Sequence, residues 1–150
     1  MKVVEFLRQE AVIADLRSSR KADVIQELAA AVASADGASP DEVARVLLAR
    51  EKLGSTGIGD GVAIPHGTLP SLKRLTAAFG RSRQGVAFDA IDGRPTHLFF
   101  VLLTPESAVG LQALARVSRL MRDADFREKL MSAGSAADIY AVLKDGDDRS

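Results

Sequence analysis

One histidine in this sequence stands in a setting that suits nucleophilic chemistry. His66 lies between Pro65 and Gly67, and the short apolar run 62–64 ends at the residue before Pro65. Proline has no N–H to donate to a sheet, so we expect a strand over 62–64 to stop there and to present the imidazole at its end. A glycine at position 67 leaves the ring open on one side. Histidine ordinarily titrates near pH about 6.5, so much of it is neutral and nucleophilic at cellular pH. This setting favours a group-transfer role for His66 over a structural one.

A glycine-rich loop precedes the histidine. Residues 54–61 hold four glycines together with the hydroxyls of Ser55 and Thr56. Glycine is typical of backbone that takes positive φ or that closely approaches a ligand. Phosphoryl transfer depends on positioning and on neutralising the charge of the phosphoryl oxygens, so the two hydroxyls and the loop amides could bind such a group on His66. We expect Asp60 to be a turn residue, not an acid or base.

Arg50 ends an expected helix just before this loop. A cation at that end is favoured by the helix dipole even without another role. The alternative is that its guanidinium binds the oxygens of a phosphoryl group on His66. We expect the next residue, Glu51, to be a solvated helix charge or a partner of Arg50.

Other chemistries lack support in the sequence. The segment 57–61 does not run from a strand into a helix, so it is not a dinucleotide-binding fingerprint. The chain has two histidines, no cysteine and no tight carboxylate cluster, so we predict no zinc site, no other metal and no cofactor. The G-x-S-x-G motif that carries the nucleophile of many serine hydrolases is also missing.

Hydrophobic periodicity predicts an α/β architecture. Ser39 and Glu42 form a capping box, and Pro40 suits the first turn of the helix that follows. The unbroken apolar run 98–103 indicates a central strand covered on both faces. The predicted helices cover 21–35, 40–53, 111–121, 125–131 and 136–143, and the predicted strands cover 62–64, 75–81, 86–88 and 98–103. We therefore predict one α/β sandwich domain over residues 1–150, ending in a frayed polar tail from about 145.

Composition narrows the class of protein. Twenty basic and twenty acidic side chains cancel, and no basic block is present, so nucleic acid and anionic membranes are poor partners. No apolar run approaches the length of a membrane span, and cysteine is absent. We expect a soluble cytoplasmic protein whose partner is a protein or a small anion.

The segment 50–67 closely resembles the active-site signature of the fructose/mannitol-type enzyme IIA domains of the bacterial phosphotransferase system. Within that family, the segment 86–95 and the stand-alone length are most similar to the nitrogen-regulatory branch. The resemblance implies a three-layer sandwich with a mixed sheet of about five strands. It also implies that His66 accepts a phosphoryl group from a phosphocarrier protein, that Arg50 is the family's conserved arginine, and that phosphorylation regulates target proteins.

Two alternatives to this regulatory role stay open. One is a cytoplasmic IIA component of fructose or mannitol uptake, and the other is a non-catalytic binding module switched by phosphorylation of His66. The chain also departs from many relatives, which carry a second histidine before a leucine where this chain has Gly110 before Leu111. We expect His97, the other histidine, to be a polar residue at a strand end.

Overall fold

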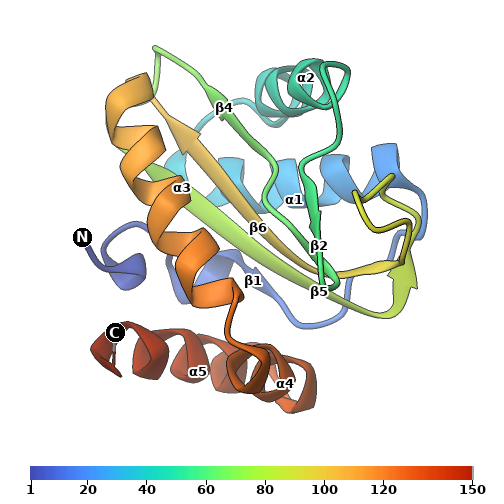
Figure 1. Ribbon diagram of the computed structural model, residues 1–150. Coiled ribbons are helices and arrows are strands. Elements are labelled where there is room, and N and C mark those ends of the chain that lie inside the picture. Colours follow the sequence, from blue (N-terminus) through green and yellow to red (C-terminus); the bar gives the residue numbers. More distant parts are fainter. Residues whose placement is uncertain (150) are drawn as a thin grey trace.

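The computed structural model describes residues 1–149, except for the side chain of Asp36, and is shown in Figure 1. The strands are β1 (Val12–Ile13), β2 (Gly57–Gly59), β3 (Val62–Ala63), β4 (His66–Thr68), β5 (Thr76–Val86) and β6 (Thr96–Thr104). The α-helices are α1 (Lys21–Asp36), α2 (Pro40–Glu51), α3 (Ser107–Met121), α4 (Ala124–Ser132) and α5 (Ala136–Arg149). Two short 3₁₀ turns, η1 (Val3–Glu5) and η2 (Gln9–Ala11), precede β1.

The strands form one mixed sheet in the order β1-β5-β6-β3-β2, and β4 also pairs with β6. β5 and β6 are antiparallel, as are β2 and β3, whereas β1 runs parallel to β5 and both β3 and β4 run parallel to β6. Every residue from Leu98 to Leu103 is at most 2% exposed. The predicted central strand and mixed sheet are therefore confirmed, with six strands among the described residues instead of about five.

Helices cover both faces of this sheet (Figure 1). α1 packs on β5 behind the sheet, and α3 packs on β6 in front of it. α2 contacts both α1 and β4, while α5 reaches β1. The predicted three-layer α/β sandwich is confirmed.

The helix ends follow local chemistry only in part. Ser39 accepts a hydrogen bond of 3.3 Å from the backbone N–H of Glu42, as the capping box predicted. α3 begins four residues before the predicted start, at Ser107, because its first turn adds little to the apolar periodicity that the prediction used. No helix among residues 1–149 combines the length and the apolar composition that crossing a membrane requires.

β5 is one long strand, whereas the sequence predicted two short ones. Its pairing with β6 shifts register between Arg81 and Val86. Arg81 is fully buried, and its guanidinium donates to the carbonyl oxygens of Ala14 and Leu130, both at 2.9 Å. It also donates to the carbonyl oxygen of Ala133. This strand position breaks the apolar pattern because its cation binds the end of α4.

The segment from residue 145 is not a frayed tail. It continues α5 to Arg149, and Asp147 is fully buried. The carboxylate of Asp147 accepts hydrogen bonds from the backbone N–H of Val4 at 3.2 Å and from Arg116 at 3.1 Å. The polar composition misled the prediction because these partners lie far away in the sequence. Ser150, which the predicted tail included, lies outside the described residues.

Candidate active site

His66 begins a strand, which differs from its predicted place beyond a strand end. β3 and β4 lie end to end along β6, so that Val62 pairs with Leu98 and His66 pairs with Leu102. Pro65 lacks an N–H and so cannot donate a hydrogen bond to the sheet. Its carbonyl oxygen still accepts a hydrogen bond of 2.9 Å from the N–H of Leu102, so pairing resumes at once.

The backbone fixes the orientation of the His66 ring. Nδ1 lies 2.7 Å from the carbonyl oxygen of Ile64. A carbonyl oxygen can only accept, so Nδ1 carries the hydrogen and Nε2 has the lone pair in the neutral ring. No protein group within residues 1–149 is hydrogen-bonded to Nε2, and the side chain is partly exposed. Nε2 therefore carries the free lone pair of the neutral ring.

His66 opens into a cavity of about 230 Å³. The walls come from β4, β6 and the first turns of α3, and the lining residues are His66, Gly67, Thr68, Leu102, Thr104, Ser107, Gly110, Leu111 and Leu114. The partial positive charge at the N-terminal end of α3 favours an anion on this side of the cavity. Leu111 is 67% exposed at the rim.

Gly110 lies in this cavity and leaves room for Thr104. A Cβ at position 110 would lie 2.6 Å from Cγ2 of Thr104. The hydroxyl of Thr104 donates to the carbonyl oxygen of Glu106 at 2.6 Å, which fixes its side chain. A histidine at this position would require Thr104 to move, and here the ring of His66 has a backbone carbonyl as its support.

Gly67 has a packing role that the sequence did not predict. A Cβ at this position would overlap Cγ1 of Val46 on α2. The glycine therefore makes room for α2 to pack against β4, and it also lines the cavity of His66.

Arg50 is in the last turn of α2, the helix that packs against β4, and it is not among the residues that line the His66 cavity. It follows Val46 by one helical turn, so both residues share the face of α2 that packs against β4. Nη1 of Arg50 donates to the carbonyl oxygen of Gly54 at 2.9 Å. One donor of the guanidinium thus holds the start of the glycine-rich loop.

The two hydroxyls of the loop have intramolecular partners. Ser55 donates to the carbonyl oxygen of Phe88 at 2.6 Å and accepts from the N–H of Gly57 at 3.0 Å. The hydroxyl of Thr56 donates to the carboxylate of Glu51. Both hydroxyl hydrogens therefore shape the loop in this structure and are not directed to a phosphoryl group.

Asp60 is a turn residue, as predicted. It has φ 56° and Gly61 has φ 76°, which is typical of the two-residue turn that joins the antiparallel strands β2 and β3. The N–H of Asp60 donates to the carboxylate of Asp92 at 3.1 Å. Asp92 also accepts from the N–H of Arg94, and these two hydrogen bonds, that from Arg94 first, lower the pKa of its carboxyl.

Glu51 is neither solvated nor a partner of Arg50. It is 8% exposed, and its carboxylate lies 3.1 Å from Nζ of Lys21. Sequence reasoning missed both residues because they lie on different helices. The one signal in the sequence was a carboxylate in the last turn of a helix, where the helix dipole opposes it.

His97 has a structural role at the start of β6. Its Nδ1 lies 2.8 Å from the carbonyl oxygen of Ser82. A Cβ on Gly85 would lie 2.9 Å from Cε1 of this ring, so the imidazole packs directly over the glycine.

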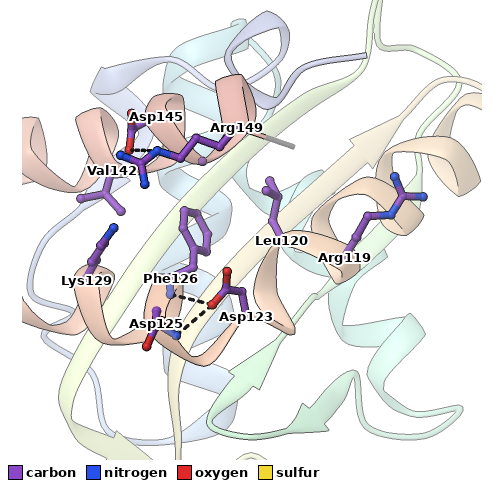
Figure 2. A pocket seen from close by; sticks show the side chains of 10 residues that line it. Arg119, Leu120, Asp123, Asp125, Phe126, Lys129, Val142, Asp145 and Arg149 are labelled. Atoms are coloured by element: carbon purple, nitrogen blue, oxygen red, sulfur yellow. Dashed lines mark hydrogen bonds and ion pairs between the residues drawn. The ribbon is translucent and has the colours of Figure 1, made fainter.

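A second cavity, of about 290 Å³, lies among α3, α4 and α5 and is shown in Figure 2. Phe126 and Leu120 line it together with charged side chains of both signs, and Asp145 and Arg149 pair across 3.1 Å. It contains none of the residues that the sequence predicted for the site.

Comparisons with known proteins identify relatives of this chain. The family model described as "Phosphoenolpyruvate-dependent sugar phosphotransferase system, EIIA 2" matches residues 5–146. A nitrogen regulatory protein of Bradyrhizobium diazoefficiens is 43% identical over 145 residues, which cover 95% of each chain. The fructose-specific EIIABC component of Bacillus subtilis is 34% identical over 150 residues, or 98% of this chain and 24% of that protein. The crystal structure of nitrogen regulatory protein IIA-Ntr from Neisseria meningitidis superimposes with a TM-score of 0.86 and 38% identity, covering 93% of this chain and 97% of that one.

Proposed function

Because this chain belongs to the EIIA type 2 family of the phosphoenolpyruvate-dependent sugar phosphotransferase system, we propose that Nε2 of His66 accepts a phosphoryl group from a phosphocarrier protein. The observation that carries this proposal is the 2.7 Å hydrogen bond from Nδ1 to the carbonyl oxygen of Ile64. It leaves the lone pair on Nε2, in a residue that lines a cavity. The chain is thus a phosphotransferase component similar to nitrogen regulatory proteins.

In the proposed step, the bond between phosphorus and the donor's histidine nitrogen breaks as a bond between phosphorus and Nε2 forms. The carbonyl of Ile64 holds the ring and stabilises the positive charge that the ring gains. Arg50 donates one N–H to Gly54, and its other donors bind phosphoryl oxygens. Ser55 and Thr56 support the loop, and Gly67 keeps α2 close to β4.

We further propose that the phosphorylation state of His66 regulates partner proteins. The support is that relatives named nitrogen regulatory protein match over almost the whole chain. A phosphoryl group adds about −1.5 to −2 charges, which changes the surface around His66 and so the proteins that bind there. Uptake of fructose is the second candidate, and the match to a fructose-specific component favours it.

Intact mass spectrometry tests the phosphoryl transfer. The protein is incubated with phosphoenolpyruvate, the general phosphotransferase enzyme and its phosphocarrier protein. We expect the mass to rise by one phosphoryl group in wild type and to stay unchanged in His66→Ala, which keeps a folded circular dichroism spectrum. An unchanged mass for wild type would refute the proposal.

Partner capture and growth separate regulation from uptake. Pull-downs with wild type and His66→Asp should recover different proteins if phosphorylation is a switch, and identical sets would count against one. Slow growth of a deletion strain on fructose or mannitol would instead support uptake.

A further inference from the structure

Glu51 carries a buried charge in an unfavourable place. It is the last residue of α2, where the helix dipole opposes a carboxylate, and it is 8% exposed. Its carboxylate accepts hydrogen bonds from Thr56 alone among the described residues, one from the backbone N–H at 3.1 Å and one from the hydroxyl. A carboxylate in this position needs a compensating cation.

Lys21, the first residue of α1, supplies that cation. Its Nζ lies 3.1 Å from Oε1 of Glu51 and 4.7 Å from the centre of the Phe88 ring. Its contact of 3.6 Å with Asp89 involves a carboxylate that is 81% exposed, so solvent screens it. Glu51 is therefore the main ionic partner of Lys21, and this ion pair connects the start of α1 to the end of α2.

The hydrogen bonds continue from Thr56 to the histidine. The carbonyl oxygen of Thr56 accepts from the N–H of Ile64 at 3.0 Å. The carbonyl oxygen of the same Ile64 accepts from Nδ1 of His66 at 2.7 Å. An unbroken series of contacts thus runs from Lys21 through Glu51 to the imidazole.

We propose that Glu51, held by Lys21, is a positioning residue for the phosphoryl acceptor. It fixes Thr56, which fixes the Ile64 peptide, whose carbonyl keeps the hydrogen of His66 on Nδ1 and the lone pair on Nε2. Glu51 itself does not touch the phosphoryl group. This inference rests on the proposed function for its kinetic consequence, but the state of the ring can be measured without any phosphoryl transfer.

Three variants test the pair. Glu51→Gln keeps the size of the side chain and removes its charge, Lys21→Met removes the cation but keeps an apolar side chain near Phe88, and Lys21→Arg restores a cation. Glu42→Gln is the matched control, because Glu42 is on the same helix and its carboxylate accepts a long, exposed hydrogen bond of 3.4 Å from the hydroxyl of Ser71.

The first measurement is ¹⁵N NMR of the His66 ring in the unphosphorylated protein, at a pH where the ring is neutral. We expect the hydrogen on Nδ1 in wild type, Lys21→Arg and Glu42→Gln. In Glu51→Gln and Lys21→Met we expect a mixture with the hydrogen on Nε2. The second measurement is single-turnover transfer from the phosphocarrier protein. We expect its maximal rate to fall roughly tenfold in these two variants, with unchanged half-saturation, about the effect of one lost hydrogen bond.

The outcomes separate the two proposals. A ring that keeps its hydrogen on Nδ1 in both variants, with unchanged maximal rate, overturns the positioning role even if both variants are less stable. If Glu51→Gln does not fold, Lys21→Met decides by the same criteria, since Lys21 is partly exposed. In another outcome, the tautomer differs between wild type and these two variants while the wild type never gains a phosphoryl group. That result refutes the proposed function and leaves the link between Glu51 and the ring intact.

Discussion

At the scale of single residues, the carbonyl oxygen of Ile64 orients the His66 ring, and we propose that the guanidinium of Arg50 binds the phosphoryl group that the ring accepts. Arg50 donates one N–H to Gly54 and has four more to offer. Nothing else on the face of α2 toward β4 carries a cation among the described residues. Its contribution to transfer can therefore be measured separately.

We expect Arg50→Ala to slow phosphoryl transfer by roughly 10²-fold or more, because charge on the phosphoryl oxygens then lacks its neutralising donor. Arg50→Lys should recover only part of the rate, since an ammonium lacks the planar fork. Single-turnover rates check this, with Arg45→Ala as the control, because Arg45 is exposed on the same helix. Equal rates for the two alanine variants would contradict it.

The absent side chain at position 110 gives a second prediction. Gly110→Ala should destabilise the fold by about 1–3 kcal/mol, because its Cβ would meet Cγ2 of Thr104 at 2.6 Å. Thr104→Ser removes that methyl and keeps the hydroxyl bonded to Glu106. In that background Gly110→Ala should be neutral or stabilising by up to about 1 kcal/mol, because alanine favours a helix.

Urea denaturation of the four proteins in this cycle measures the free energy of unfolding. Additive effects of the two substitutions would show that Thr104 does not set the tolerance at position 110.

Residue types and spacing in the sequence single out His66 and Arg50 as candidates, but they do not identify the partners of the neighbouring residues. The hydroxyls of Ser55 and Thr56 were expected to bind phosphate, and both instead donate to acceptors of the protein that lie outside the loop. Their acceptors come from Phe88 and Glu51, and only the packing of α2 and the segment after β5 brings these together. Local spacing carries no information on such contacts.

At the scale of secondary structure, long periodic segments were predictable and short ones were not. α1 and α2 have apolar patterns that extend over 16 and 12 residues, β6 has an unbroken apolar run over 98–103, and all three elements were predicted at their observed places in the chain. β2 consists of Gly57, Ile58 and Gly59, so it has one side chain to show a pattern. Pairing with β3 through the Asp60–Gly61 turn, not propensity, makes it a strand.

We expect the contact of that turn with the segment after β5 to depend on pH. The pKa of Asp92 is lowered, first by the N–H of Arg94 and then by that of Asp60. A lowered carboxyl pKa means that the stabilisation is complete above the ordinary value of about 3.9 and is lost as the pH falls through the lowered one.

We therefore expect Asp92→Asn to be less stable than wild type at neutral pH and the difference to vanish in acid. Thermal unfolding from neutral pH down to strongly acidic pH, together with an NMR titration of Asp92, checks this. A difference that persists unchanged below the titration of Asp92 would contradict it.

At the scale of the whole molecule, buried charges join elements that are distant in the chain. Arg81 is fully buried on β5 and binds carbonyl oxygens before α1 and at the end of α4. Burial, and to a lesser degree Arg83, lowers the pKa of its guanidinium. The sequence predicted the sandwich but not this contact, because an arginine inside a strand is more often exposed.

We expect Arg81→Met to destabilise the protein by about 3 kcal/mol or more, since several buried carbonyl oxygens lose their donor. The exposed neighbour gives the control, and Arg83→Met should change the stability by less than about 1 kcal/mol. Urea denaturation measures both. The transfer rate per folded molecule should stay at the wild-type value in both variants, because α4 holds no residue of the His66 cavity.

The contacts of Asp147 and Asp148 with the start of the chain have a practical consequence. The N–H of Val4 lies 3.2 Å from Asp147, and Nζ of Lys2 lies 2.9 Å from Asp148. The first and last helical turns are thus adjacent, as Figure 1 shows. A short peptide could splice them together, and the circle could be reopened near Gly37, between α1 and α2. Such a circular permutant would retain every contact of the imidazole while moving the site for a fusion partner to another corner of the protein.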